Sequence, residues 1–152
     1  MSIITIILTV MATYIFMEFV AWSAHKFVMH GFLWNLHRDH HQKNLNQKYE
    51  KNDWFFLMFA TPSFLLMYFG FEASEINFMF WVGIGIALYG ITYVFVHDVF
   101  IHQRIKIFRN TNSHYFLAMR RAHKMHHKHL GKVNGEAFGF LWVPQKYRNN
   151  YK

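Results

Sequence analysis

Three long runs of apolar residues limit what this chain can fold into more than any other feature of its sequence. The runs cover about residues 3–24, 54–71 and 77–96, and Glu18 is the one charged residue within them. A helix needs about 20 apolar residues to cross a bilayer, and the first run would extend over about 33 Å at roughly 1.5 Å per residue. The sequence therefore predicts an all-α integral membrane protein, with about three transmembrane helices in one domain over residues 1–152.

Three details of the apolar segments refine the prediction. The segment Met1 to Val10 contains no Lys or Arg, unlike a secretory signal peptide, so the first run is expected to be a retained span. Residues 138–143 are also apolar but too short to cross, so a fourth membrane segment is left open. Glycines 83, 85 and 90 of the third run are expected to allow close helix packing.

The net charge of +8 is distributed unevenly along the chain. Of the 16 Lys and Arg residues, five lie between Lys26 and Lys51 and eleven follow His102, whereas the turn at 71–76 carries only Glu72 and Glu75. The positive-inside rule then places 26–53 and 103–152 in the cytoplasm and the N-terminus outside. This topology explains the charge without nucleic-acid binding, for which the chain has no recognised module.

The chain has no cysteine. A built-in iron–sulfur cluster and thiolate ligation of haem or zinc are therefore excluded. Any metal must be held by histidine and carboxylate side chains, and electrons for redox chemistry must come from another protein.

Ten of the 12 histidines form a pattern that occurs twice. Each copy consists of an H-x4-H pair at the end of a span, followed by an H-x2-H-H motif. The remaining two, His114 and His129, are expected to be surface residues. The ten pattern histidines are His25, His30, His37, His40 and His41 in the first copy, and His97, His102, His123, His126 and His127 in the second.

The spacing of the histidines suggests how they could meet a metal. Residues three and four apart share a helix face, so each H-x2-H-H motif is expected to face one metal region. Five residues turn a regular helix by about 140°, so each H-x4-H pair is expected to bridge parts of a site or straddle a helix end. Two spans separate the copies and return the chain to the same side, which predicts one cytoplasmic histidine-rich cap. Ten imidazoles exceed the needs of one four-coordinate zinc, and iron suits imidazole ligands with open positions.

Three carboxylates lie near this pattern. Asp39 and Asp98 lie inside the motifs and are candidates to accept the distal N–H of a ligating imidazole, although a solvated loop role is equally open. Glu18 would be costly if charged in lipid, so it is expected to face the site or the bundle interior.

At these motifs the sequence resembles the bacterial β-carotene hydroxylases of the fatty acid hydroxylase superfamily. The resemblance runs from about Glu18 to Pro144. It is carried by H-K-F-V-M-H-G, H-R-D-H-H, A-H-K-M-H-H, the H-D-V-F-I-H-Q-R form of the third box, and the late F-G-F-L-W-V-P. It implies that the ten pattern histidines ligate a non-haem di-iron centre that uses O2.

The same resemblance implies a substrate and partners. The substrate would be a carotenoid that enters from the bilayer and is hydroxylated at C3 of its β-rings, giving zeaxanthin through cryptoxanthin, or astaxanthin from canthaxanthin. Electrons would come from a ferredoxin-type donor. A basic face is expected to dock the donor or to anchor at lipid headgroups; it comprises Arg104, Lys106, Arg109, Arg120 and Arg121. The location implied is a bacterial inner membrane.

Other functions are compatible with histidine boxes. A carotenoid 4-ketolase, or another lipid hydroxylase or desaturase, could carry similar motifs. From a different class, a membrane metal transporter or a haem-binding protein remains open. A transporter is expected to carry ionisable ligands within its spans, whereas these histidines lie at the span ends.

Overall fold

The computed structural model describes residues 1–43, 49–72 and 76–149, and in this part of the chain the secondary structure is entirely helical. Three long helices carry the apolar runs: α1 (Ile3–Ser23), α3 (Trp54–Glu72) and α4 (Phe78–Tyr93). With the short helical segments that continue them, the helices Ile3–Phe32, Lys51–Phe71 and Phe78–Ile101 are long and apolar enough to cross a membrane. The prediction of three spans is confirmed. The turn expected at 71–76 falls partly outside the described residues.

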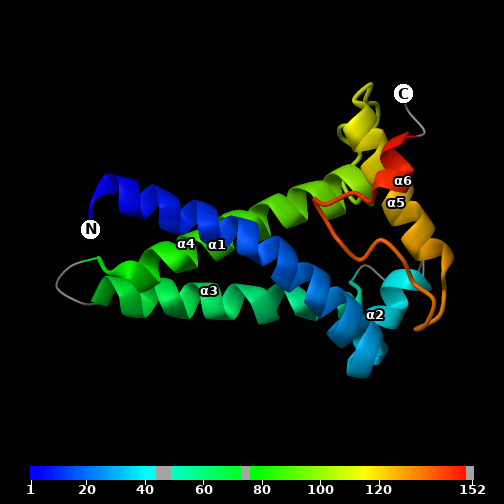
Figure 1. Ribbon diagram of the computed structural model, residues 1–152. Coiled ribbons are helices and arrows are strands. Elements are labelled where there is room, and N and C mark those ends of the chain that lie inside the picture. Colours follow the sequence, from blue (N-terminus) through cyan, green and yellow to red (C-terminus); the bar gives the residue numbers. More distant parts are fainter. Residues whose placement is uncertain (44–48, 73–75, 150–152) are drawn as a thin grey trace.

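The three long helices form a bundle in which α4 packs against both α1 and α3. The N-terminus lies at one end of the bundle, and the shorter helices gather at the other end (Figure 1). These are α2 (Trp34–His41), α5 (His114–Lys128) and α6 (Gln145–Arg148), and a short 3-10 helix, η2 (Lys51–Asp53), leads into α3. We call this end of the molecule the cap. Residues 138–143 cross beside the bundle as a non-helical segment, which we call the strap.

The outer faces of the bundle are apolar. Large side chains such as Ile3, Ile15 and Phe64 are 62–73% exposed, although they would be expected inside a water-soluble protein. Lipid tails can cover such faces, so the helices must be held together by close packing and polar contacts rather than by exclusion of water.

Small residues supply that packing where α4 meets its neighbours. A Cβ atom at Gly85 would lie 2.6 Å from Thr13 Cβ, and one at Gly83 would lie 2.8 Å from the carbonyl oxygen of Ser63. The Ser63 hydroxyl also donates to the Gly83 carbonyl at 2.8 Å. Close packing is thus confirmed for Gly83 and Gly85. For Gly90 the expectation is wrong, because a Cβ atom there would meet no atom within 4 Å.

The first and third spans change their helix type as they enter the cap. The α-helices continue as π-helical segments, η1 (Ala24–Phe32) and η3 (Val94–Ile101). Bonds between residues five apart close both segments: the N–H of Leu33 donates to Val28 O at 3.0 Å, and that of His102 donates to His97 O at 2.8 Å. A bend at Gly31 then directs the chain into α2. η1 carries the first H-x4-H pair, and η3 carries His97 of the second pair, with His102 directly after its end.

Candidate metal centre

All ten pattern histidines come together in the cap. They form two adjacent groups, in each of which the possible ligand atoms lie within 4.8 Å of one another. His127 adjoins the second group, with its Nε2 atom 2.9 Å from that of His123. The first group is His25, His30, His37, His41 and His126, and the second is His40, His97, His102 and His123.

The grouping differs from the expectation that each H-x2-H-H motif faces one metal region. His37 and His41, four residues apart on α2, share the first group, while His40 belongs to the second. On α5 the outer two histidines again pair, but in the other group: His123 and His127 meet at the second group, and His126 belongs to the first group. In each motif, adjacent residues differ by about 100° around the helix, so the central histidine points away from the other two. Each copy of the pattern thus supplies one histidine to the other copy's group.

The π-helical segments explain the H-x4-H spacing. The expected turn of 140° assumed an α-helix, but a π-helix pairs residues five apart and so brings them onto neighbouring turns. The rings of His25 and His30 are 5.3 Å apart, and those of His97 and His102 are 4.5 Å apart. Each pair therefore faces one group, and the expectation of divergent directions is corrected.

The Nδ1 atoms of these imidazoles point outward to hydrogen-bond acceptors. Four of the five histidines in the first group donate to backbone carbonyls at 2.8–3.1 Å, and His37 donates to Asn52 Oδ1 at 2.6 Å. A carbonyl oxygen can only accept, so Nδ1 must carry the proton. This tautomer leaves the lone pair on Nε2. The four carbonyls, for His25, His30, His41 and His126, belong to Phe138, Lys132, His129 and Glu136.

The Nε2 atoms point inward, toward one another. In the first group, His30 Nε2 lies 3.2 Å from that of His41 and 3.3 Å from that of His126. These atoms carry lone pairs, so neither can donate to the other, and their close approach is an arrangement that suits the binding of one cation by several imidazoles. In the second group, His40 Nε2 is buried without a hydrogen-bond partner among the described residues. The donor set therefore fits metal ions bound through Nε2.

Burial keeps these imidazoles in their neutral, ligating form. Desolvation lowers the pKa of His37 to about 2, of His126 to about 3 and of His41 to about 4. It also lowers the pKa of His127 to about 2 and holds that of His40 well below its usual value. Neighbouring imidazoles add to the effect in each case, because a protonated ring would repel a second one.

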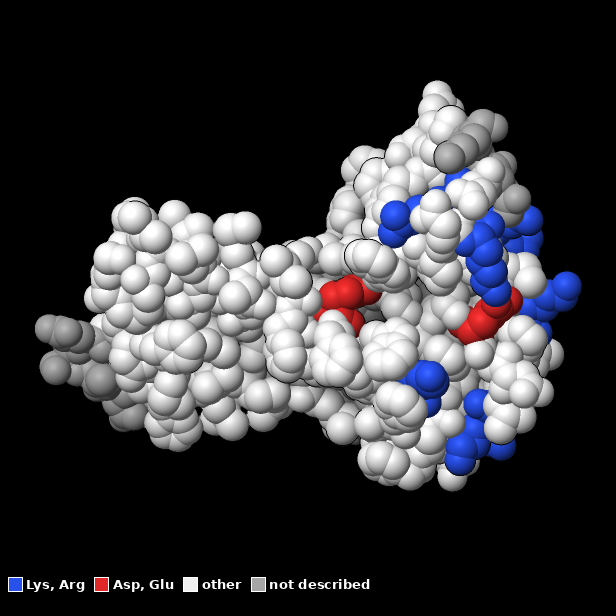
Figure 2. Space-filling view, viewed as in Figure 1, with Lys and Arg blue, Asp and Glu red and all other residues white. Residues whose placement is uncertain are grey.

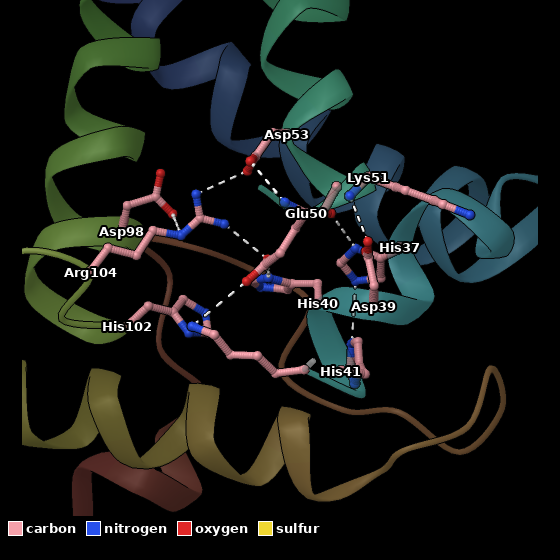
Figure 3. Close-up of polar contacts among 12 residues, drawn as sticks. His37, Asp39, His40, His41, Glu50, Lys51, Asp53, Asp98, His102 and Arg104 are labelled. Atoms are coloured by element: carbon pink, nitrogen blue, oxygen red, sulfur yellow. Dashed lines mark hydrogen bonds and ion pairs between the residues drawn. The ribbon is translucent and has the colours of Figure 1, made fainter. Parts of the chain in front are cut away.

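Two carboxylates accept hydrogen bonds from histidines of the second group. Asp98 Oδ1 accepts from His97 Nδ1 at 2.9 Å, in the role considered for it from the sequence. Glu50 Oε2 accepts from His40 Nδ1 at 2.7 Å. Asp39 instead accepts the backbone N–H of Lys51 at 2.6 Å (Figure 3). The role of Glu50 was not predicted from the sequence. The signal that it offers there is its place three residues before Asp53, the spacing of a capping box at the start of the second span.

Glu18 faces the bundle interior, as expected. Its Oε1 accepts three backbone N–H groups of the strap, from Phe140, Leu141 and Trp142, at 2.8–2.9 Å, and its Oε2 accepts from Tyr89 OH at 2.8 Å. Glu18 therefore fixes the strap to α1 and α4, and the strap contains Phe138, whose carbonyl holds His25.

An apolar cavity of about 610 Å³ leads from the bundle to both histidine groups. Side chains of α1, α3, α4 and the strap line most of it, and His25, His97 and His123 form its cap end. Three lining residues, Phe56, Ile91 and Phe95, are also 47–66% exposed on the outer face of the bundle. The cavity thus connects the candidate metal centre with the surface that faces lipid.

The predicted basic face is only partly available to a partner. Arg104 contacts three carboxylates, and Arg120 donates to the backbone carbonyls of Phe100, Phe108 and Arg109. Both side chains therefore have structural roles. Lys106 and Arg121 are exposed. Figure 2 shows that on one face of the molecule Lys and Arg gather over the cap.

Comparison with known proteins identifies relatives along most of the chain. The model of the fatty acid hydroxylase family matches residues 10–143. A beta-carotene hydroxylase of Pantoea ananas is 38% identical over 90% of this chain and 77% of its own length. One from Paracoccus sp. (strain PC1) is 34% identical over 90% of this chain and 83% of its own, and beta-carotene 3-hydroxylase 2 of Arabidopsis thaliana, chloroplastic, is 35% identical over 86% and 43%. No solved structure gives a significant match.

Proposed function

The chain belongs to the fatty acid hydroxylase family, and on that premise we propose that it is a membrane monooxygenase that hydroxylates the β-rings of carotenoids at C3. The observation that carries the proposal is the apolar cavity that ends on histidines of both groups. Its substrate would be β-carotene, converted to zeaxanthin through cryptoxanthin, or canthaxanthin, converted to astaxanthin.

The cavity supports a substrate drawn from the bilayer. Its volume of about 610 Å³ lies within the range of about 300–1,000 Å³ usual for small-molecule sites, and its lining is predominantly apolar and aromatic. A β-ring could pass between Phe56 of α3 and Ile91 of α4 and reach His97 without entering water. The rest of the long polyene would remain in the lipid.

The paired histidine groups support a di-iron centre. The ten pattern histidines would hold two iron ions through Nε2, because seven of them have an acceptor for Nδ1. When bound, the irons would supply the redox chemistry by which O2 is reduced with electrons from a separate donor. One oxygen atom enters the C–H bond as hydroxyl and the other leaves as water, with two electrons and two protons consumed.

The protein's own residues prepare the site for this chemistry. The acceptors for Nδ1 fix the tautomer and orientation of the imidazoles. Aromatic lining residues such as Phe55 and Phe138 exclude water from the path between lipid and histidines. Tyr93, whose ring stacks on His97 at a centroid distance of 4.7 Å, closes the cavity on the α4 side.

The electrons are proposed to come from a ferredoxin-type donor on the cytoplasmic side of a bacterial inner membrane. The positive charges of the cap support this side, since Lys and Arg are retained there. The exposed Lys106, Arg109 and Arg121 could contact an acidic donor or anionic headgroups.

Product analysis tests the proposed function. The chain would be expressed in bacterial cells that make β-carotene, and the pigments would be separated by chromatography and identified by mass. We expect cryptoxanthin and zeaxanthin, and none in matched cells that express His123→Ala. Products with 4-keto rings would indicate a ketolase instead, and unchanged β-carotene would reject both functions.

A further inference from the structure

Arg104 lies in the loop after η3, where its guanidinium contacts carboxylates from two parts of the chain (Figure 3). Nη2 lies 2.9 Å from Glu50 Oε2 and Nη1 lies 3.0 Å from Asp53 Oδ1, both at the start of the second span. Nε lies 3.8 Å from Asp98 Oδ1, at the end of the third span. Its backbone N–H also donates to the Asp98 carbonyl at 2.9 Å.

Two of these three carboxylates hold imidazoles of the same histidine group. The oxygen of Glu50 that meets Arg104 also accepts from His40, and the oxygen of Asp98 that faces Arg104 also accepts from His97. His40 and His97 both belong to the second group, and their rings stack at a centroid distance of 5.0 Å. None of the acceptors in the first group touches Arg104 in the part of the chain that the structure describes.

The charges explain why this arrangement needs a guanidinium. Glu50, Asp53 and Asp98 converge on one place with side chains only 11–34% exposed, so without a central cation their charges would repel one another. A carboxylate that turned away would release Nδ1 of its histidine, and the proton could then move to Nε2 and block metal binding. Lys43 lies 3.8 Å from Glu50 Oε1 but is a single point charge, whereas Arg104 directs three different nitrogens.

We propose that Arg104 is a positioning residue for one of the two metal sites, the one built on His40, His97, His102 and His123. It acts through Glu50 and Asp98, which it neutralises and holds against His40 and His97. The inference rests on the proposed two-metal function and deepens it.

Metal content measured on purified protein tests this role. Arg104→Gln and Arg104→Lys would be compared with the parent chain and with Arg121→Gln, an exposed arginine on α5. We expect Arg104→Gln to lose one metal of two and its product formation to fall roughly 10- to 100-fold, as happens when partners of metal ligands are removed. Arg104→Lys should not restore the metal, and Arg121→Gln should retain both metals.

A triple variant separates positioning from general stability. Glu50→Gln and Asp98→Asn keep an oxygen acceptor for each histidine but remove two of the three charges that Arg104 neutralises. Combined with Arg104→Gln, they should restore the second metal above the level of Arg104→Gln alone. This comparison still works if Arg104→Gln is poorly folded, since in the triple variant Asp53 is the one carboxylate of the three that keeps its charge, and it has no second charge to repel.

Two results would overturn the inference: both metals retained in Arg104→Gln, or no gain of metal in the triple variant. Failure of the proposed function would be recognised separately, from the parent chain. A parent that binds two metals but makes other products would remove the carotenoid assignment and leave the role of Arg104 standing. A parent with normal products and an Arg104→Gln variant with full metal content would leave the carotenoid assignment standing and remove the role of Arg104.

Discussion

At the scale of single residues, the cap is organised by the outward bonds of its imidazoles. Backbone carbonyls at 129, 132, 136 and 138 fix four rings, so one loop after α5 sets the tautomers of four of the five histidines in the first group. Among the described contacts, His129 takes part through its backbone, whose carbonyl oxygen accepts from His41, and any residue would provide that oxygen.

Alanine substitution separates these roles. His126→Ala removes a fully buried ring, so we expect nearly complete loss of product and of one metal. His129→Ala keeps the carbonyl that binds His41 and should retain most of the activity. Product yield and metal content of the two variants provide the measurement, and a His126→Ala protein with full activity would show that the ligand set is wrong.

The lowered histidine pKa values predict a pH dependence of stability in the metal-free protein. A histidine in the unfolded chain has a pKa of about 6.5, whereas burial lowers that of His37 and His127 to about 2 and that of His41 to about 4. Below about pH 6.5 the unfolded chain therefore binds protons that the folded chain does not. The free energy of unfolding should therefore decrease as the pH is lowered below about 6.5, by up to about 1.4 kcal/mol per histidine for each pH unit.

Thermal unfolding of metal-stripped protein in detergent, at about pH 7.5 and about pH 5, measures this effect. The unfolding temperature should be lower at the acidic pH. In a variant with asparagine at both His37 and His127, the difference in unfolding temperature between the two pH values should be smaller. An equal difference in the two proteins would contradict the lowered pKa values of these histidines.

At the scale of elements, α4 has two different faces. Its Gly83 and Gly85 meet α3 and α1 with no room for a side chain, whereas Gly90, one to two turns further on, borders the cavity. Packing and substrate access are therefore separated along the same helix.

This separation predicts opposite effects of two substitutions. Gly85→Val would force Thr13 and α1 away and should destabilise the bundle by about 1–3 kcal/mol. Gly90→Phe should leave the unfolding temperature and metal content unchanged but fill the cavity and lower product formation. Thermal unfolding and product yield, measured on both variants with Gly90→Ala as the control, test the distinction. Normal product yield from Gly90→Phe would show that the substrate takes another path.

Local sequence predicted the elements better than their details. The three spans followed from the apolar runs, because each run is long enough for a helix to cross a bilayer. The π-helical segments could not be predicted, because their hydrogen bonds depend on how the span ends pack in the cap. The exchange of His40 and His126 between groups also depends on how α2 faces α5. The contacts of Glu50 and of the four backbone carbonyls with histidines were not predicted, because a sequence motif does not determine the path of a loop in space.

At the scale of the whole molecule, the histidines and the positive charges lie at the same end of the bundle. The sequence predicted this convergence, since two spans separate the two copies of the pattern. The side of the membrane on which the cap lies remains a prediction from the distribution of Lys and Arg.

The absence of cysteine from the chain allows a direct test of this topology. A single cysteine at Ser2 should react with a membrane-impermeant maleimide in intact cells, whereas one at Lys124 should react only after the cells are opened. Both positions are exposed, so access to the reagent depends on the membrane alone. The reverse labelling pattern would place the cap outside.

The exchange of histidines between the two groups also bears on how the protein is made. As the chain leaves the ribosome, the first span, α2 and the second span can enter the membrane before α5 exists, yet the first group then lacks His126 and the second has only His40. Neither group can be completed by an N-terminal fragment. If the two groups hold metal as proposed, loading of both must wait until synthesis has passed residue 126, so a chain that is truncated or stalled before that residue would not carry a finished centre.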